Sequence, residues 1–444
     1  MSKTFRPYDP RQSFLLPPSP QEWLPEEHLA YFVLDVVETL DLRELMAPYE
    51  GEERGQPPYD PRMMLALLVY GYCVGVPSSR KIEQRTYEDV AFRVIACNQH
   101  PDHSRISNFR RRHLSVLGSL FVQVLKLCRR AGLVGLGRVA LDGTKVKANA
   151  SRHKAMSYGR MKEDEAKLEA KVKELLSAAE AADRAEDEQE RIHGRTQIPE
   201  ELRRAETRLA RIRKLKSELE AEAKQQQKDD DQEPPAGAAT LPSHRVPTEN
   251  DGTPTSKAQR NFTDAESRIQ KGHDGFVQGY NCQAAVDADH QIIVAQAVTN
   301  QPPDVEHLIP LVDQVRANLG RKPKQLLADS GYYSEANVTW LESRDIDPFI
   351  ATGRSRLERK KAPRGRIPKD LTVKQRMARK LATKRGAAVY ARRKVLPEPV
   401  FGQIKHVRGF RQFLMRGLEK VRAEWSLISL THNLLKLHRA QCFA

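Results

Sequence analysis

The 444-residue sequence has few cysteines, no paired-cysteine motif and no long apolar segment. Its five cysteines are widely spread and form no Cys-x-x-Cys pair, which argues against a disulfide framework and a structural zinc site and suits a reducing cytoplasm. The longest nearly apolar run, residues 63–76, contains two Tyr and two Gly and is too short to span a bilayer. The first residues also lack the apolar core of a signal peptide. These absences predict a soluble, cytoplasmic protein with no membrane partner.

Acidic residues are outnumbered, since 58 Asp and Glu stand against 74 Lys and Arg and leave a net charge of +16. An excess of this size favours a polyanionic partner, DNA or RNA first, although the solvated basic surface of a ribosomal or metabolic protein has the same balance. Residues 353–394 hold 17 Lys and Arg against two acids, so 15 of the 16 excess charges lie there. Such a segment suits a surface that follows phosphates. A disordered basic tail is the alternative, weakened by the folded-looking sequence that follows.

Residues 1–135 have the pattern of a helical domain. Asp60-Pro61 marks the start of one helix. Residues 101–104 form a turn in which Ser104 is expected to cap another helix, which carries the basic run Arg110, Arg111 and Arg112. Short helices followed by a capped, basic helix suit a helix-turn-helix DNA reader. A plain helical bundle has the same pattern and stays an open alternative.

A charged helical segment, residues 155–256, interrupts a region of strand-like patterns. Two apolar repeats at helical spacing predict an antiparallel helical hairpin followed by a flexible linker over residues 224–256. The hairpin is interpreted as a solvated insertion, with an oligomer clamp or a DNA clamp as alternatives. The repeats are Leu168, Val172, Leu175 and Ala179, then Ile198, Leu202, Ala205, Leu209 and Ile212.

The pattern of residues 136–154 and 257–444 predicts a mixed α/β, or α+β, domain with C-terminal helices. Strands are expected at 139–141, 276–286, 292–298, 325–328 and 348–351. Helices are expected at 305–319, with a cap near Asp304, and at 335–344, 399–405 and 418–437.

Two aspartates, Asp142 and Asp329, each follow a short apolar strand. Adjacent parallel strands would place their carboxylates side by side at the C-terminal edge of the sheet. The two carboxylates would repel one another unless a cation lay between them. Mg²⁺ or Mn²⁺ is therefore the ion expected to bind there. A turn residue after a strand is the alternative for each Asp, and the spacing leaves both interpretations open.

A third acid, Glu398, lies between Tyr390 and Lys405. Pro399 suits the first turn of a helix, so Glu398 is expected at the helix N-terminus with Lys405 on the same face. A carboxylate pair with a third acid is what two-metal phosphoryl transfer requires: one ion activates the attacking water or 3′-hydroxyl, and the other stabilises the leaving oxygen. An acid placed to favour the helix dipole is the alternative.

Several short motifs carry a resemblance to a known family. They are residues 59–61, 101–104 through Phe109-Arg110, 141–145 (Leu-Asp-Gly-Thr-Lys), 275–281 (Gly-Phe-Val-Gln-Gly-Tyr-Asn), 328–333 (Ala-Asp-Ser-Gly-Tyr-Tyr), 398–402 (Glu-Pro-Val-Phe-Gly) and 416–421 (Arg-Gly-Leu-Glu-Lys-Val). With them the chain resembles the DDE transposases of bacterial insertion sequences, in particular the insertion-sequence eleven-eighty-two group, related to the insertion-sequence four and five families. The resemblance covers nearly the whole chain.

The resemblance implies an RNase H-like catalytic core in which Asp142, Asp329 and Glu398 hold two Mg²⁺ (or Mn²⁺) ions. It also implies a helical N-terminal domain that binds the element's terminal inverted repeats, with Arg110, Arg111 and Arg112 as candidate DNA contacts. The double-stranded DNA partners are those repeats and a target DNA. A homodimer in the synaptic complex and a place at the bacterial nucleoid are further expectations.

Related families carry the signature Tyr-x₂-Arg-x₃-Glu-x₆-Lys, whose Tyr, Arg and Lys engage the DNA end. Tyr390, Arg393, Glu398 and Lys405 match it, except that four residues, not three, separate Arg393 from Glu398. Lys394 would restore the spacing with a different cation.

The function predicted is therefore metal-dependent cleavage and strand transfer at the inverted repeats of an insertion sequence. One rival is a related metal-dependent nuclease that cuts without strand transfer. The other is a catalytically inactive DNA-binding protein derived from a transposase. The intact set of acids and the basic segment argue against the inactive protein.

Overall fold

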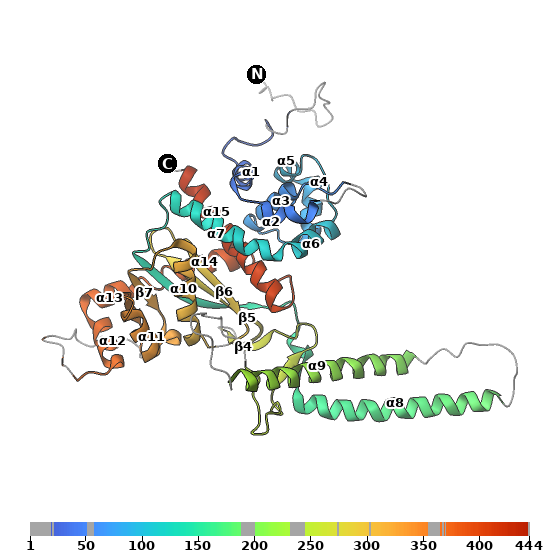
Figure 1. Cartoon of the computed structure of the whole chain (residues 1–444). Coiled ribbons are helices and arrows are strands. Elements are labelled where there is room, and N and C mark those ends of the chain that lie inside the picture. The colour runs from blue at the N-terminus through green and yellow to red at the C-terminus, as the bar shows by residue number, and fades with distance from the viewer. Residues whose placement is uncertain are drawn as a thin grey trace, which may run out of the picture. The chain divides into compact units, whose positions relative to one another are not determined.

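The computed structural model describes residues 19, 22–50, 57–187, 200–230, 245–272, 275–301, 303–353, 365, 368 and 370–442, with the backbone alone over 179–187 and 228–230. The chain divides into two compact units (Figure 1). One comprises Met1–Val124 and Leu430–Ala444, and the other Leu125–Ser429. In these described ranges, every helix is too short or too polar to cross a membrane.

The first unit is helical, as expected from the sequence. Its core helix is α3, in which every residue except Arg62 is buried, because its sequence is apolar on all sides. The helices are α1 (Leu29–Thr39), α2 (Arg43–Met46), α3 (Pro61–Cys73), α4 (Ser79–Glu88), α5 (Val90–Ile95), α6 (His103–Arg112) and the larger part of α7 (Leu114–Arg130), with the last part of α15 (Leu418–Cys442).

Helix α6 has a different cap from the one predicted. Asp102 is the N-cap residue, and its carboxylate accepts hydrogen bonds from the backbone N–H groups of Ser104 (2.8 Å) and Arg105 (3.0 Å). Ser104 therefore lies in the first turn and does not cap the helix. A carboxylate is favoured at this place because it carries the charge that the helix N-terminus attracts.

The second unit is built on a mixed six-stranded sheet, which confirms the expected mixed α+β class. The strand order is β4-β5-β1-β7-β8, and β6 pairs along β5. Strands β1, β7 and β8 run parallel, whereas β4, β5 and β6 join by antiparallel pairing. The strands are β1 (Arg138–Lys147), β4 (Arg268–Gly272), β5 (Gly275–Asp287), β6 (Ile293–Thr299), β7 (Gln325–Ala328) and β8 (Asp347–Ile350).

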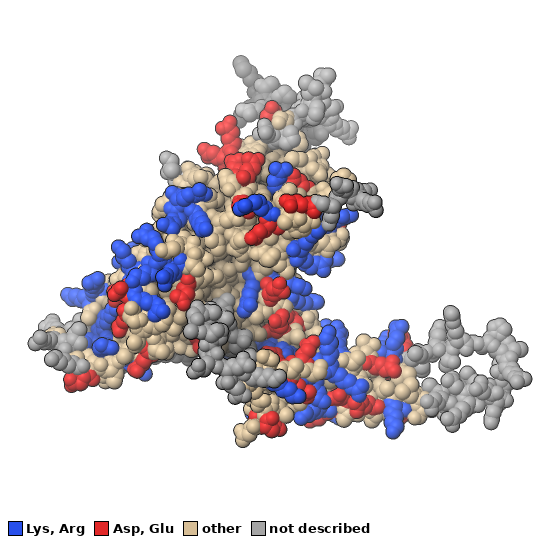
Figure 2. Space-filling model, viewed as in Figure 1, with Lys and Arg blue, Asp and Glu red and all other residues tan. Residues whose placement is uncertain are grey.

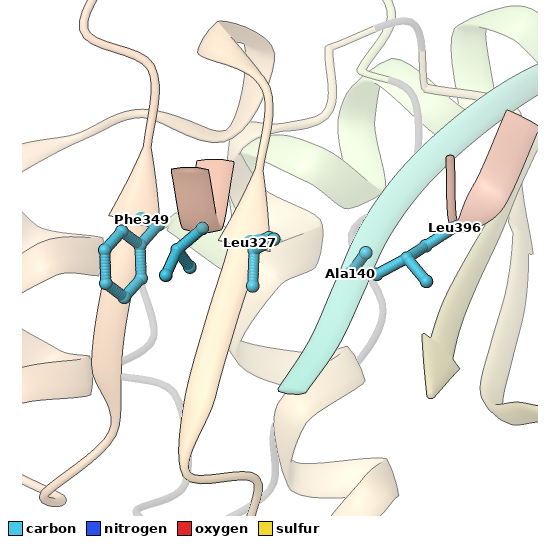
Figure 3. Close-up of a cluster of buried hydrophobic side chains, with 5 residues drawn as sticks. Ala140, Leu327, Phe349 and Leu396 are labelled. Atoms are coloured by element: carbon cyan, nitrogen blue, oxygen red, sulfur yellow. The ribbon is translucent and has the colours of Figure 1, made fainter. Parts of the chain in front are cut away.

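A cluster of buried side chains holds the three parallel strands together (Figure 3). Leu327 in β7 is the register partner of Ala140 in β1 and of Phe349 in β8, so these side chains share one face of the sheet. Val389 and Leu396 pack against them from the segment after β8. The cluster holds the first half of β1 against β7, next to the candidate catalytic acids.

The helices of this unit include α10 (Leu308–Leu319) and α11 (Glu335–Glu342), near the predicted ranges. The basic segment contains two helices that the sequence did not predict, α12 (Val373–Ala382) and α13 (Lys384–Ala391). A Thr372 and Gln375 capping box starts α12. The part of this segment at residues 354–364 lies outside the described residues.

The insertion is an antiparallel pair of long helices, α8 (Tyr158–Asp187) and α9 (Glu200–Asp230) (Figure 1). It projects from a two-stranded sheet in which β2 (Ala155–Ser157) pairs with β3 (Gln259–Asn261). The predicted apolar positions of α9 are buried, namely Leu202, Ala205, Leu209 and Ile212. Ile198 and the side chain of Ala179 lie outside the described residues.

The segment predicted as a linker is partly structured. Helix α9 extends to Asp230, and Val246 and Ala258 pack with Tyr158, Leu219 and Ala223 in a small core at the base of the helices. These apolar side chains hold the returning chain against α8 and α9. Residues 231–244 of the predicted linker lie outside the described residues.

Candidate active site

Asp142 and Asp329 lie at neighbouring positions of two parallel strands. The pairing of β1 with β7 ends at Ala140 and Leu327. Asp142 lies two residues further along β1, and Asp329 directly follows the last residue of β7. Asp142 does not end its strand, contrary to the prediction, because β1 continues to Lys147 in antiparallel pairing with β5. It is β7 that ends, so both carboxylates lie at the edge where the parallel pairing stops.

Asp142 is largely buried, with 17% of its side chain exposed. One oxygen accepts a hydrogen bond from the backbone N–H of Gly143 (2.9 Å), and the other lies 3.4 Å from Nη1 of Arg393. Burial raises the pKa of Asp142 to about 6; Arg393 acts in the opposite direction, and Asp329 and Asp304 add to the increase. Burial is therefore the main reason why the ionised form of Asp142 is disfavoured, and the neighbouring acids add to it.

Asp329 begins a tight turn. Its Oδ1 accepts a hydrogen bond from the backbone N–H of Gly331 at 2.8 Å. A Cβ atom at Gly331 would lie 3.0 Å from Oδ1 of Asp329 and 3.4 Å from Oδ2 of Asp304. Glycine at this position therefore leaves room for two carboxylates to approach the same point.

Asp304 is the site residue that the sequence pattern misses. It stands at the N-cap position before the turn Val305–His307, as expected, but its side chain makes no capping bond. Instead, Oδ1 accepts hydrogen bonds from Asn281 Nδ2 (2.7 Å) and Gln283 Nε2 (2.6 Å) and lies 3.8 Å from Lys145 Nζ. Asn281 and Gln283 alternate along β5 and so share a face, which is the one sequence signal that could have identified this polar cluster.

Glu398 is placed differently from the two aspartates. Helix α14 (Pro397–Gly402) begins at Pro397, two residues before the predicted start, and Glu398 is an exposed residue of its first turn. Among the described residues, no three His, Cys, Asp or Glu side chains are arranged so that they could hold a metal ion. The structure therefore brings Asp142 and Asp329 together and leaves Glu398 at the surface of α14.

The other residues of the family signature lie near the acids. Tyr390 packs against the buried cluster that contains Ala140 and Leu327, and burial raises the pKa of Tyr390. Lys405 lies in a π-helical turn (Gln403–Val407), so it is not on the straight helical face expected, and its Nζ donates to the carbonyl of Lys145 (2.7 Å). Arg393 contacts Asp142, and its buried Nε has no hydrogen-bond partner among the described residues.

The basic run of α6 is divided between interior and surface. Arg110 is buried, and its Nη1 donates to the hydroxyl of Tyr72 and the carbonyl of Pro77, each at 3.1 Å. These bonds indicate a structural role for Arg110. Arg111 and Arg112 are exposed, and Arg112 donates to the carbonyl of Pro48 (3.0 Å) while it stacks over Tyr49.

The donor chemistry of the site fits a divalent cation. Carboxylate oxygens are the ligands that Mg²⁺ and Mn²⁺ prefer, and Asp142 and Asp329 occur together in a partly buried place where each raises the cost of the other's charge. The buried, unpartnered Nε of Arg393 provides a further donor that a phosphate oxygen would satisfy.

Two family models match the chain. Residues 243–434 match the model described as "Transposase DDE domain", and residues 18–112 match the one described as "Transposase domain (DUF772)". The first match includes Asp329 and Glu398 but begins after Asp142. Comparisons with curated proteins and with solved structures find no match. The two matched regions together indicate that the chain is a transposase of the kind found in the insertion-sequence four and five families.

Proposed function

We propose that this protein cleaves DNA at the terminal inverted repeats of an insertion sequence and joins the freed ends to a target, as a member of the eleven-eighty-two group. The pair formed by Asp142 and Asp329 at one edge of the parallel strands is the observation that carries the proposal. Asp142, Asp329 and Glu398 would hold two divalent cations in a core of RNase H-like fold. Such ions activate the attacking water or 3′-hydroxyl and stabilise the leaving oxygen.

Arg393 has a defined part in this proposal. Arg393 offsets the charge of Asp142, which it approaches to 3.4 Å. A guanidinium binds phosphate through two parallel hydrogen bonds, and its Nε is unoccupied among the described residues. Arg393 therefore exchanges the carboxylate for a DNA phosphate, which frees Asp142 for a cation and orients the DNA end.

Several surfaces would contact the DNA. Tyr390 and Lys405 are proposed beside Arg393, and the exposed Arg111 and Arg112 are proposed in the helical unit. The surface over α12 and α13 is rich in Lys and Arg (Figure 2). Double-stranded DNA is the partner, and a homodimer is the proposed state of the synaptic complex.

A cleavage assay tests the proposed function. The full-length protein is incubated with labelled duplexes that carry the DNA ends flanking its gene, with Mg²⁺, with Mn²⁺ or with EDTA. Cleavage is expected at the repeat boundary with either metal and at background level with EDTA, since no cation would then lower the pKa of the attacking water or stabilise the leaving oxygen. A duplex with the repeat sequence scrambled is the control. Equal cleavage in EDTA would contradict the metal-dependent mechanism.

The basic helices α12 and α13 give a second prediction. Arg376, Lys384 and Arg385 are exposed on them, and replacing all three by Gln removes up to three phosphate contacts. The slope of log affinity against log salt is expected to fall by about 2.7, at about 0.9 for each contact. Fluorescence anisotropy between 50 and roughly 200 mM salt measures it. A slope equal to that of the parent protein would exclude these helices from the interface.

A further inference from the structure

A basic groove lies at the base of the α8–α9 insertion. Its volume is about 710 Å³. None of the twelve described residues that line it is acidic, and six are Lys or Arg. The cationic lining residues are Lys154, Arg160, Arg203, Arg204, Arg208 and Arg211, together with His153.

Three parts of the chain converge to build this groove. Arg204, Arg208 and Arg211 recur at helical spacing along one face of α9. Arg160 comes from the start of α8, and Lys154 lies just before β2. The floor is held in place by the backbone, because the N–H of Phe262 donates to the carbonyl of Lys154 at 3.0 Å.

The charges of this groove are only partly compensated. Arg204 pairs with Glu200, and Arg208 lies 3.5 Å from Asp164. Lys154, Arg160, Arg203 and Arg211 are exposed and form no ion pair in the part of the chain that the structure describes. Four cationic side chains without an ion-pair partner among the described residues are thus exposed to solvent around the groove.

Outside the groove, α8 and α9 carry ten Lys and Arg against 17 Asp and Glu, so the rest of the insertion is acidic. Arg213 pairs with both Glu165 and Glu169, and Lys216 pairs with Glu165 at 2.7 Å. Lys171 pairs with Glu201 at 2.6 Å. Figure 2 shows Lys and Arg alternating with Asp and Glu along these helices. Uncompensated positive charge is therefore a local property of the groove and not a general feature of a solvated helix.

We propose that this groove binds the sugar–phosphate backbone of duplex DNA, as a contact separate from the acid pair. Five of its six cations are arginines, whose planar guanidinium matches phosphate oxygens in two parallel hydrogen bonds. Several cations around one groove, four of them without an ion-pair partner among the described residues, suit a regularly spaced polyanion. The groove holds DNA beside the catalytic unit without reading its sequence, because phosphate contacts position a duplex and carry no base information.

Substitutions in the full-length chain test this proposal. Arg160→Gln, Arg203→Gln and Arg211→Gln are combined, since these exposed side chains can be changed without breaking an ion pair of the described structure. The affinity for duplex DNA at about 0.1 M salt is expected to fall by at least about tenfold, and the salt slope by about 2 to 3. The matched control replaces Lys173, Lys214 and Lys224, exposed on α8 and α9 outside the groove, by Gln.

Each outcome decides the question. A loss in the groove variant that exceeds the loss in the control supports the proposal, provided that circular dichroism shows unchanged helix content. Equal affinities and slopes in the two variants overturn it, and so does a groove variant that loses binding to polyglutamate but not to DNA. If the groove variant binds normally while the α12–α13 variant does not, the groove proposal fails and the proposed transposase function stands. Parent protein that binds no duplex overturns both.

Discussion

Replacing Asp142 or Asp329 by Asn will lower the rate of DNA cleavage by at least about a thousandfold, or roughly 4 kcal/mol of transition-state stabilisation. Asn keeps the shape of the side chain and removes the charge that would hold a cation. Asp142 is largely shielded from water, and burial already opposes its ionised form. Removing the Asp142 carboxylate should therefore weaken cation binding more than removing a solvent-exposed carboxylate would. Single-turnover cleavage of labelled repeat DNA in Mg²⁺ measures the rate.

Glu398→Gln is expected to cause a loss of similar size, although Glu398 is exposed in α14. Glu419→Gln is the matched control, because Glu419 is also an exposed acid in the first turn of a helix and lies in α15. If the two variants cleave equally well, Glu398 serves the helix dipole and not the reaction. DNA affinity should be retained in all these variants, which separates loss of chemistry from loss of binding. Parent-like cleavage by Asp142→Asn and Asp329→Asn would refute the assignment of the pair.

Leu327→Ala will lower the free energy of unfolding of the second unit by about 2–5 kcal/mol. Leu327 is fully buried between Ala140 and Phe349, and its truncation leaves a cavity between three parallel strands. Urea unfolding followed by tryptophan fluorescence measures the change in a Trp23→Phe background. The two remaining tryptophans, Trp340 and Trp425, then both report on the second unit.

Leu327→Met is the control for this core position, with a cost below about 1.5 kcal/mol because volume is nearly conserved. The Leu327→Ala variant should also cleave DNA more slowly than the parent in the absence of urea. Leu327 is two residues from Asp329, and a shift of about 1 Å in the position of a catalytic group lowers the rate strongly. If Leu327→Ala is as stable as Leu327→Met, the buried cluster around Leu327 does not hold β1, β7 and β8 together.

The places of β1 and β7 could be predicted because local patterns encode them, whereas a metal-binding role of the two aspartates beside them stays a prediction. Short apolar runs before Asp142 and Asp329 identified β1 and β7, and the apolar cluster explains why those runs are buried. The true length of β1 could not be read from the run at 139–141. Its second half is half-buried, and its strand conformation comes from pairing with β5, a partner more than a hundred residues away in the sequence.

Asp304 illustrates the second limit of sequence patterns. In the sequence it stands after two prolines and before a helix, which is an ordinary capping position. Its place in the site depends on Asn281 and Gln283, which are distant in the sequence. Their side-chain amides donate hydrogen bonds to the Asp304 carboxylate, which therefore does not cap the helix. Arg110 shows the same limit, since its position in a basic run gave no sign of its bonds to Tyr72 and Pro77.

The pairing of β2 with β3 brings the two ends of the α8–α9 insertion to one place. Ser157 and Gln259 are register partners, so the chain leaves the catalytic unit and re-enters it at one place. A tight turn could join the two strands there, and the entropic cost of a longer connection grows only with the logarithm of its length. A change in the length of these helices would thus leave the register of the strand that carries Asp142 unchanged, whereas loss of the whole insertion would leave the buried Arg260 and Arg268 without their partner Glu222.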